Sequence, residues 1–166
     1  VMHKIAIAGM EANSEENLIA QFVNILGEKV YSDHFTVLLM EPDQQRLRVY
    51  ATYCEGVLTQ DDEIFVSIGN GVVGTVAQNG KPGRIDDVRE CENYIELNPD
   101  IRSELCVPML VGERVFGVLN AESEKESAFT AADERFLMTT ASQLAIVLQN
   151  LRLNAETQKR AFEMER

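Results

Sequence analysis

The sequence predicts an α+β fold built on a central antiparallel sheet, and three observations carry this prediction. Strand-like runs follow one another through short turns, as they do in hairpins. Segments with helical spacing of apolar residues stand near both ends of the chain. In the hairpin of residues 103–123, apolar residues fall on both faces of the strands. A further layer must therefore cover each face of the sheet.

The first helix is expected over residues 14–30. Asn13 and Ser14 are candidate N-cap residues, and Glu15 and Glu16 place negative charge in the first turn. Apolar residues then recur every three or four positions, which is typical of an amphipathic helix. These residues are Leu18, Ile19, Phe22, Val23, Leu26 and Val30.

The middle of the chain predicts strands joined mainly by turns. The runs "FTVLLME" and "RLRVYATY" form a hairpin through Pro42 and Asp43, and "EIFVSIG" is a third strand-like run. A short helix, "GVVGTVAQ", ends at Asn79 and Gly80, which is a common helix stop. The run "GRIDD" is a short strand, and residues 88–99 form a polar loop with a helical turn.

A long helix is expected after the hairpin of residues 103–123. Thr130 is its candidate cap, with Asp133 and Glu134 in the first turn. Its apolar stripe comprises Leu137, Ala141, Leu144, Val147 or Leu148, and Leu151. We therefore divide the chain into a lead-in helix or linker (1–13), one domain (14–153) and a charged helical extension toward an output domain or a dimer partner (154–166). Because the first residue is Val1, we expect the chain to be a fragment of a longer protein.

Charge and cysteine content exclude several classes of function. The formal net charge of −12 opposes binding to nucleic acid phosphates and to anionic lipid headgroups. No apolar run has the length of a membrane span, and no signal peptide opens the chain. Cys54, Cys91 and Cys106 form no C-x-x-C pair, so neither a zinc site nor a disulfide framework is predicted. A reducing, cytoplasmic setting fits this pattern.

Three stretches occur in this order: "GNGVVGTVAQNGKPGRIDDV", "IRSELCVPMLVGERVFGVLNAES" and "FTAADERFLMTTASQLAIVLQNLRL". Together they resemble the GAF domain, a small-molecule sensor module of phosphodiesterases, histidine kinases and bacterial regulators. The resemblance implies a sheet with the N- and C-terminal helices on one face and a ligand pocket on the other. Segments 71–79 and 86–104 would form the roof of that pocket. Members bind different ligands, including cyclic nucleotides, linear tetrapyrroles, haem, 2-oxoglutarate and formate, so the ligand and any cofactor stay unknown.

The ligands of particular GAF subgroups match this sequence poorly. Cyclic-nucleotide-binding members carry Asn-Lys where Glu122 and Ser123 stand here, although "FTAADE" matches the other half of their motif. Cys91 falls where bilin-binding members attach their chromophore, but Glu92 follows it where a His is usual. His3 and His34 are expected to lie outside the roof, which disfavours haem.

Two further patterns in the sequence are similar to those of enzymes. "GNGVVG" has the form of a dinucleotide-binding turn, but its helix is short and no βαβ series follows, so we interpret it as a strand-to-helix turn that needs small residues. Members that reduce free methionine sulfoxide use roof cysteines, and one of these would align with Val73 and another near Leu97. Neither residue is Cys. We therefore expect no enzyme activity, no catalytic residue and no metal site.

The predicted ligand contacts are polar residues around an apolar hollow, which is the usual composition of a small-molecule site. They are Thr75, Asp87, Tyr94, Arg102, Ser103 and Cys106. An alternative is that Arg102 pairs with Asp86 or Asp87 and only fixes the loop, and that Cys106 is a packing residue. We expect a homodimer formed through the terminal helices and an output partner such as a kinase, a cyclase or a transcription regulator. Two other hypotheses are a dimerisation module with a vestigial pocket and a redox enzyme that uses Cys91 or Cys106.

Overall fold

A computed structural model describes residues 4, 14–31, 33–60 and 63–165. Within these residues a seven-stranded sheet has the order β3-β2-β1-β7-β6-β5, with β4 also paired to β2. Every pairing is antiparallel. The strands are β1 His34–Met40, β2 Arg46–Cys54, β3 Val57–Thr59, β4 Phe65–Ser67, β5 Gly83–Ile85, β6 Ser103–Val111 and β7 Arg114–Ser123.

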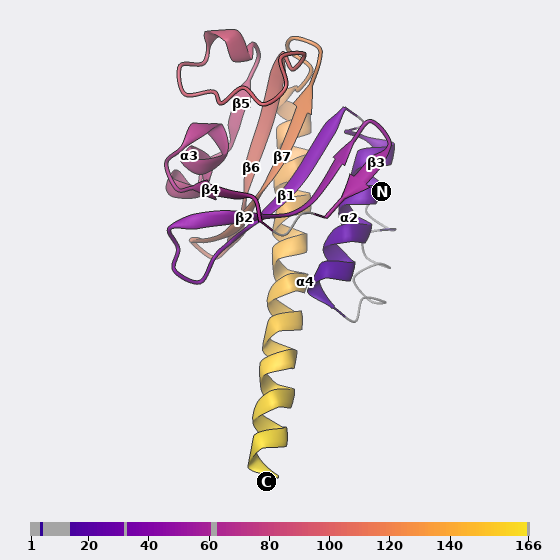
Figure 1. The fold of residues 1–166 in the computed structure, drawn as a ribbon, viewed down its shortest axis with the longest axis vertical. Helices are drawn as coiled ribbons and strands as arrows, with labels where there is room; N and C mark the ends of the chain where they lie inside the picture. Colours follow the sequence, from indigo (N-terminus) through magenta and orange to yellow (C-terminus); the bar gives the residue numbers. More distant parts are fainter. Residues whose placement is uncertain (1–3, 5–13, 32, 61–62, 166) are drawn as a thin grey trace.

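Two helices cover one face of the sheet (Figure 1). Helix α2 (Glu15–Lys29) packs on β1 and β2, and helix α4 (Ala131–Met164) packs on β6 and β7. Their apolar stripes join the inward residues of the strands in one large core. The expected caps form, because Ser14 accepts from the backbone N–H of Asn17 and Thr130 makes a capping box with Asp133.

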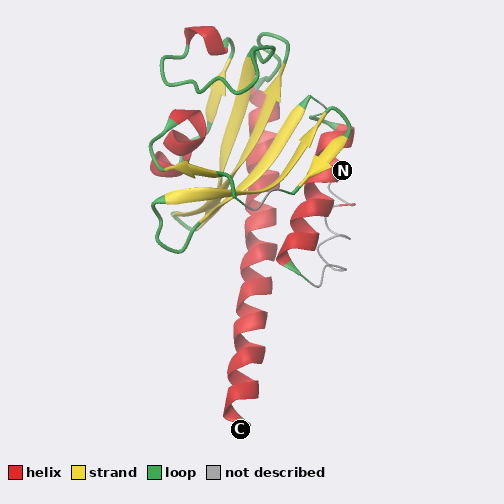
Figure 2. Cartoon of the chain, in the orientation of Figure 1, coloured by secondary structure: helices red, strands yellow, loops and turns green. Residues whose placement is uncertain are grey.

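The opposite face carries helix α3 (Gly71–Asn79) and the 3-10 helix η1 (Val88–Glu90), with the loop that follows it (Figure 2). A smaller core lies under α3. Its buried members are Leu38, Leu47, Val49, Val72, Val76, Ala77, Cys106 and Val118. In β6, Leu105 and Val107 face the helices while Cys106 faces α3, so both faces of this strand are buried. The predicted α+β fold, with a covering layer on each face, is confirmed.

The "GNGVVG" segment forms a tight turn into α3. Gly69 and Gly71 have φ values of +83° and +65°, a region that favours glycine. A Cβ on Gly74 would lie 2.4 Å from the backbone oxygen of Ser67, so only glycine lets α3 approach β4. Since α3 has nine residues and no parallel strand follows it, the turn interpretation agrees with the geometry.

Helix α4 continues beyond the sheet as a single helix (Figure 1). Arg152 donates to Oε1 of Glu15 at 2.6 Å and stacks over Phe116, which holds α4 against α2 and the sheet. From Arg152 to Glu165 every described residue is exposed. A helical extension over 154–164 is thus present, whereas most of the predicted lead-in (1–3 and 5–13) lies outside the described residues. Within the described part of the chain, no helix is long and apolar enough to cross a membrane.

Candidate functional site

A cavity of about 550 Å³ lies between the sheet and the layer that contains α3. Its floor is the face of β1, β2, β6 and β7 that points away from α2 and α4. Its roof is formed by the start of α3, from Asn70 to Val73, and by Tyr94, Ile95 and Leu97 of the following loop. Ile64, Phe65 and Val66 close one end. Cavities of this size between a sheet and a covering layer suit small organic ligands.

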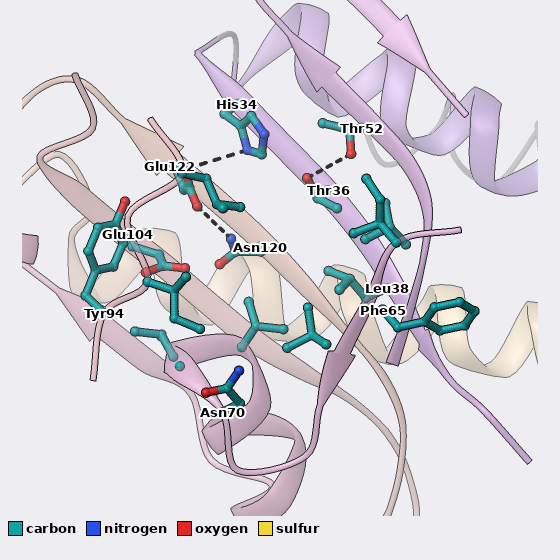
Figure 3. A pocket seen from close by; sticks show the side chains of 18 of the residues that line it. His34, Thr36, Leu38, Thr52, Phe65, Asn70, Tyr94, Glu104, Asn120 and Glu122 are labelled. Carbon is teal, nitrogen blue, oxygen red and sulfur yellow. Dashed lines mark hydrogen bonds and ion pairs between the residues drawn. The ribbon is translucent and has the colours of Figure 1, made fainter. Parts of the chain in front are cut away.

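The floor residues form three rows across the strands (Figure 3). Cross-strand pairing aligns Glu104 with Glu122 and Glu122 with His34 in the first row. The second row contains Asn120, Thr36 and Thr52, and the third contains Leu38 and Val49, with Val118 paired to Leu38 but outside the cavity lining. The cavity is therefore acidic at one end, neutral and polar in the middle, and aliphatic at the other end.

A β-bulge keeps these rows on one face. The pairing of β1 with β2 shifts between Val37 and Leu38, so that Val37 pairs with Ala51 while Leu38 pairs with Val49. The extra residue, Tyr50, packs toward the helices. Side chains alternate along a regular strand, so Thr52 and Val49 would otherwise lie on opposite faces.

The first row, here called the acidic row, contains two carboxyl groups whose pKa values are raised. Glu104 is 3% exposed, and burial together with the neighbouring Glu122 raises its pKa to about 8. Burial also raises the pKa of Glu122, against the opposing effect of His34. Nδ1 of His34 lies 3.8 Å from Oε2 of Glu122, and Nδ2 of Asn120 donates to Oε1 of Glu122 at 3.2 Å. A buried carboxyl that is protonated near neutral pH can donate a hydrogen bond or a proton.

Two buried oxygen atoms in this region lack hydrogen-bond partners among the described residues. They are Oε2 of Glu104 and Oδ1 of Asn120, and Asn120 is only 4% exposed. Leaving such groups unpaired is costly, and native proteins seldom do so. Unpaired acceptors in a cavity wall indicate a place where a ligand supplies donors.

Of the six predicted contacts, Tyr94 lines the cavity. Thr75 does not, but it helps to fix the roof: its Oγ1 donates to the carbonyl of Gly71 at 2.7 Å and accepts from Nδ2 of Asn93 at 3.2 Å. Sγ of Cys91 donates to Oδ1 of Asn93 at 3.0 Å. Thr75 and Asn93 thereby hold the roof loop against α3.

Asp87 and Arg102 are not brought together as an ion pair. Asp87 caps η1 and accepts two hydrogen bonds at 2.8 Å from the guanidinium of Arg89, which lowers the pKa of Asp87. Arg89 also pairs with Glu126. The Arg102 guanidinium donates instead to the backbone carbonyls of Pro99 and Ile101, at 2.7 and 3.0 Å. Both residues lie outside the cavity lining.

Ser103 and Cys106 are buried beside the cavity rather than in its lining. Oγ of Ser103 donates to the carbonyl of Lys125 at 2.5 Å and accepts from the N–H of Ala128 at 3.4 Å, so it joins β6 to the segment before α4. Cys106 is fully buried in the small core under α3. Burial raises the pKa of its thiol well above the ordinary value, which keeps it protonated.

Sequence reasoning missed the residues that dominate the cavity. Glu104 and Asn120 stand inside apolar strands, and a lone polar residue at such a position was the available signal. His34 lies outside the roof, as expected, but its place in the floor, where β1 pairs with β7, was not predicted. His3 lies outside the described residues.

Comparison with known proteins identifies the family. The sequence profile of the GAF domain matches residues 12–149. The chain belongs to the GAF domain family. The GAF fold is also found in the structure of free methionine-R-sulfoxide reductase from Neisseria meningitidis in complex with its substrate. That structure has a TM-score of 0.80, is 21% identical in sequence, and the match covers 93% of this chain and 89% of the other.

Two relatives differ in their named functions. Free methionine-R-sulfoxide reductase of Escherichia coli is 32% identical over 83 residues, which cover 50% of this chain and 50% of the relative. Sensor histidine kinase YhcY of Bacillus subtilis is 26% identical over 137 residues, which cover 78% of this chain and 36% of the kinase. The matched part is thus half or less of the length of these relatives.

These relatives contradict the prediction that this GAF domain is not an enzyme. That prediction rested on the absence of Cys at two aligned positions, Val73 and Leu97. A sensor and an enzyme can share one pocket of this fold, and the reactive group can come from another position. Here Cys91 lies in the same layer as Tyr94, and Glu104 is a buried acid at the cavity floor. Missing residues at two positions therefore do not exclude activity.

Proposed function

We propose that this GAF domain is a regulatory module that binds a small organic molecule in the cavity and relays the bound state through α4. The observation that carries the proposal is that β6 and β7 contribute to the cavity with one face and to the core under α4 with the other. Glu104 faces the cavity, and the adjacent Leu105 belongs to the core with Leu137 and Ala141 of α4. A ligand that moves Glu104 also moves residues that support α4.

A second connection runs through the segment between β7 and α4. Glu122 lines the cavity one residue before the end of β7, and Thr130 caps α4 only a few residues later. Arg89 joins η1 to Glu126 in this segment, and the N–H of Ser127 donates to the carbonyl of Asp86 at 2.9 Å. The roof and the start of α4 are therefore held together, so closure of the roof can alter the position of α4.

The exposed end of α4 supplies the output in this proposal. Ile146 and Leu153 are 52% and 53% exposed and lie seven residues apart, which places them on one face of the helix. We propose that this face pairs with a second copy in a parallel homodimer and that the helix leads to an output domain or partner, such as a kinase, a cyclase or a transcription regulator. The three cysteines are all unpaired, which fits the cytoplasm.

Hydrogen–deuterium exchange tests this function, with free methionine-R-sulfoxide and L-methionine as first probes because a relative is named for the former. If the proposal holds, a bound probe slows exchange in the roof (86–104) and changes exchange in residues 131–164. Slower exchange in the roof with unchanged exchange in α4 would mean that the domain binds the probe but does not transmit the bound state to α4. A Thr52→Phe variant, which fills the floor, is the matched control because Thr52 is partly exposed at the cavity.

Reduction of free methionine sulfoxide is the second candidate function, and it is favoured by a partly buried cysteine in the covering layer. Cys91 lies outside the cavity lining but packs on the same small core as Tyr94 of the roof. In this reaction a thiolate attacks the sulfoxide sulfur, methionine is released, and the oxygen stays on the cysteine as a sulfenic acid. Two equivalents of an external thiol then restore the cysteine and yield a disulfide and water. Turnover with dithiothreitol that is lost in Cys91→Ser and kept in Cys54→Ser supports this activity, and its absence in the parent protein excludes it.

A further inference from the structure

Two oxygen atoms at the acidic end of the cavity have no hydrogen-bond partner among the described residues, and they define the chemistry of its ligand. Oε2 of Glu104 and Oδ1 of Asn120 are acceptors without partners among the described residues, and both side chains are more than nine-tenths buried. Both residues line the cavity from neighbouring strands (Figure 3). A ligand group that satisfies both oxygens must carry at least two N–H or O–H bonds.

The charges around the cavity further restrict the class of ligand that it can bind. No Lys or Arg stands among the described residues that line the cavity, and His34 is the basic group nearest to the carboxylates. Glu104 and Glu122 face each other across neighbouring strands, so their charges repel when both are ionised. An anionic head group at this end would meet two carboxylates and no fixed cation, whereas a cation would relieve their repulsion.

We propose that the cavity binds a small organic cation, with an ammonium group between Glu104, Asn120 and Glu122 and a short apolar body against Leu38 and Val49. This inference rests on the proposed ligand-binding function and names the class of ligand. The three N–H bonds of a primary ammonium match the two unpaired oxygens and the carboxylate of Glu122. The aliphatic third row of the floor accommodates the body of the ligand.

Binding of a cation displaces a proton from the acidic row. The pKa of Glu104 is raised to about 8, so the carboxyl holds a proton at neutral pH. The groups that face it are Glu122 on β7, His34 beyond Glu122 on β1, and Tyr94 in the roof. An ammonium replaces the positive charge of the proton, and the proton leaves to solvent. Affinity therefore rises about tenfold per pH unit below pH 8 and levels off above it.

Isothermal titration calorimetry with three probes of one shape tests the inference. The probes are 3-methylbutylamine, 3-methylbutanol and 4-methylpentanoate, titrated at pH 7 in two buffers with different ionisation enthalpies. We expect the amine to bind at least about tenfold more tightly than the alcohol and the carboxylate, with release of about one proton per amine. Glu104→Gln is expected to weaken amine binding about tenfold or more and to remove the proton release. Glu113→Gln, an exposed change in the turn between β6 and β7 and outside the cavity lining, is expected to leave both unchanged.

The outcomes separate this inference from the proposed function. Equal or tighter binding of the alcohol or the carboxylate, blocked by Thr52→Phe, would overturn the cation assignment and leave ligand binding in the cavity intact. Amine binding without proton release, or with full affinity in a folded Glu104→Gln variant, would also overturn it. If no probe binds at millimolar concentration and Thr52→Phe changes nothing, both the inference and the proposed function fail. Circular dichroism of each variant shows that it is folded.

Discussion

Glu104 on β6 and Glu122 on β7 lie directly opposite each other across neighbouring strands, and both side chains line the same cavity. Two carboxylates in this arrangement are costly in a folded protein unless a proton or a cation is present. The pair gives the cavity its acidic end, and the strands that carry it also support α4. The pair therefore links ligand chemistry to the helix that we propose as the output.

Stability should fall as the pH rises, because the folded protein holds protons that the unfolded chain releases. The ordinary pKa of a Glu side chain is 4.5, and that of Glu104 is raised to about 8. Between these values the folded state binds more protons, so the stabilisation present at low pH is lost as the pH approaches 8. Melting temperatures measured from about pH 5 to pH 9 should fall in the parent protein. Glu104→Gln should make the melting temperature less dependent on pH. The same pH dependence as in the parent protein would show that the pKa of Glu104 is not raised.

Asn93→Ala should loosen the roof without changing the floor. The Asn93 side chain joins the roof loop to Gly71 and Thr75 of α3, at 3.4 and 3.2 Å. Loss of these hydrogen bonds should increase the dissociation rate of the amine probe several-fold, with a smaller change in the association rate. Stopped-flow displacement measures both rates. Asn98→Ala is a matched control in the same loop, since the Asn98 side chain hydrogen-bonds Asp100 and not α3.

Arg102→Ala tests whether this residue holds the loop or contacts the ligand. Its guanidinium hydrogen-bonds the carbonyls of Pro99 and Ile101 outside the cavity lining. We expect a loss of about 1 kcal/mol in the free energy of unfolding. Amine affinity should fall less than in Glu104→Gln. Chemical denaturation and calorimetry on the same samples provide both values. A larger loss of affinity than in Glu104→Gln, at unchanged stability, would make Arg102 a ligand contact.

Gly74→Ala should displace α3 from the sheet. The new Cβ would lie 2.4 Å from the carbonyl oxygen of Ser67, and backbone atoms cannot move aside as a flexible side chain can. We expect a loss of about 3 kcal/mol or more in the free energy of unfolding. Gly112→Ala is the comparison, because its φ of +63° is strained but no atom lies within 4 Å, and its cost should be about 1 kcal/mol. Similar losses would mean that α3 adjusts easily.

The exposed face of α4 should determine the oligomeric state. Replacing both Ile146 and Leu153 with Lys places charges at the centre of the proposed helix pair. Light scattering after size exclusion should then report a monomer, against a dimer for the parent chain. Lys substitutions at Ala155 and Gln158, which are also exposed but lie on the opposite side of α4, provide the control. A monomeric parent chain, or a dimer that survives the double substitution, would contradict pairing through this face.

Much of the fold could be predicted from the sequence because its signals are local. Helical spacing, cap residues such as Ser14 and Thr130, and turn glycines act within a few residues of one another. The apolar alternation on both faces of residues 103–111 also predicted two covering layers, and the structure has both. Long-range pairing was not needed for these predictions.

The site could not be predicted in the same way, because it depends on register across strands. His34 lies beside Glu122 only because β1 pairs with β7, and these two strands are far apart in the sequence. The bulge at Tyr50 brings Thr52 onto the floor, and strict alternation gives no sign of it. Arg102 and Asp87 were expected at the cavity because they lie in the roof segment. Their side chains satisfy local backbone groups and Arg89 instead.

Mass spectrometry of the freshly purified protein, native and then denatured, would show directly whether the cavity holds a cation. We expect added mass in the native spectrum of the parent protein, from a retained cation or from added 3-methylbutylamine. That mass should disappear on denaturation and be absent in folded Thr52→Phe. Mass that persists after denaturation would mean covalent attachment. A parent protein that shows no added mass, even with amine at millimolar concentration, would contradict a cation-binding cavity.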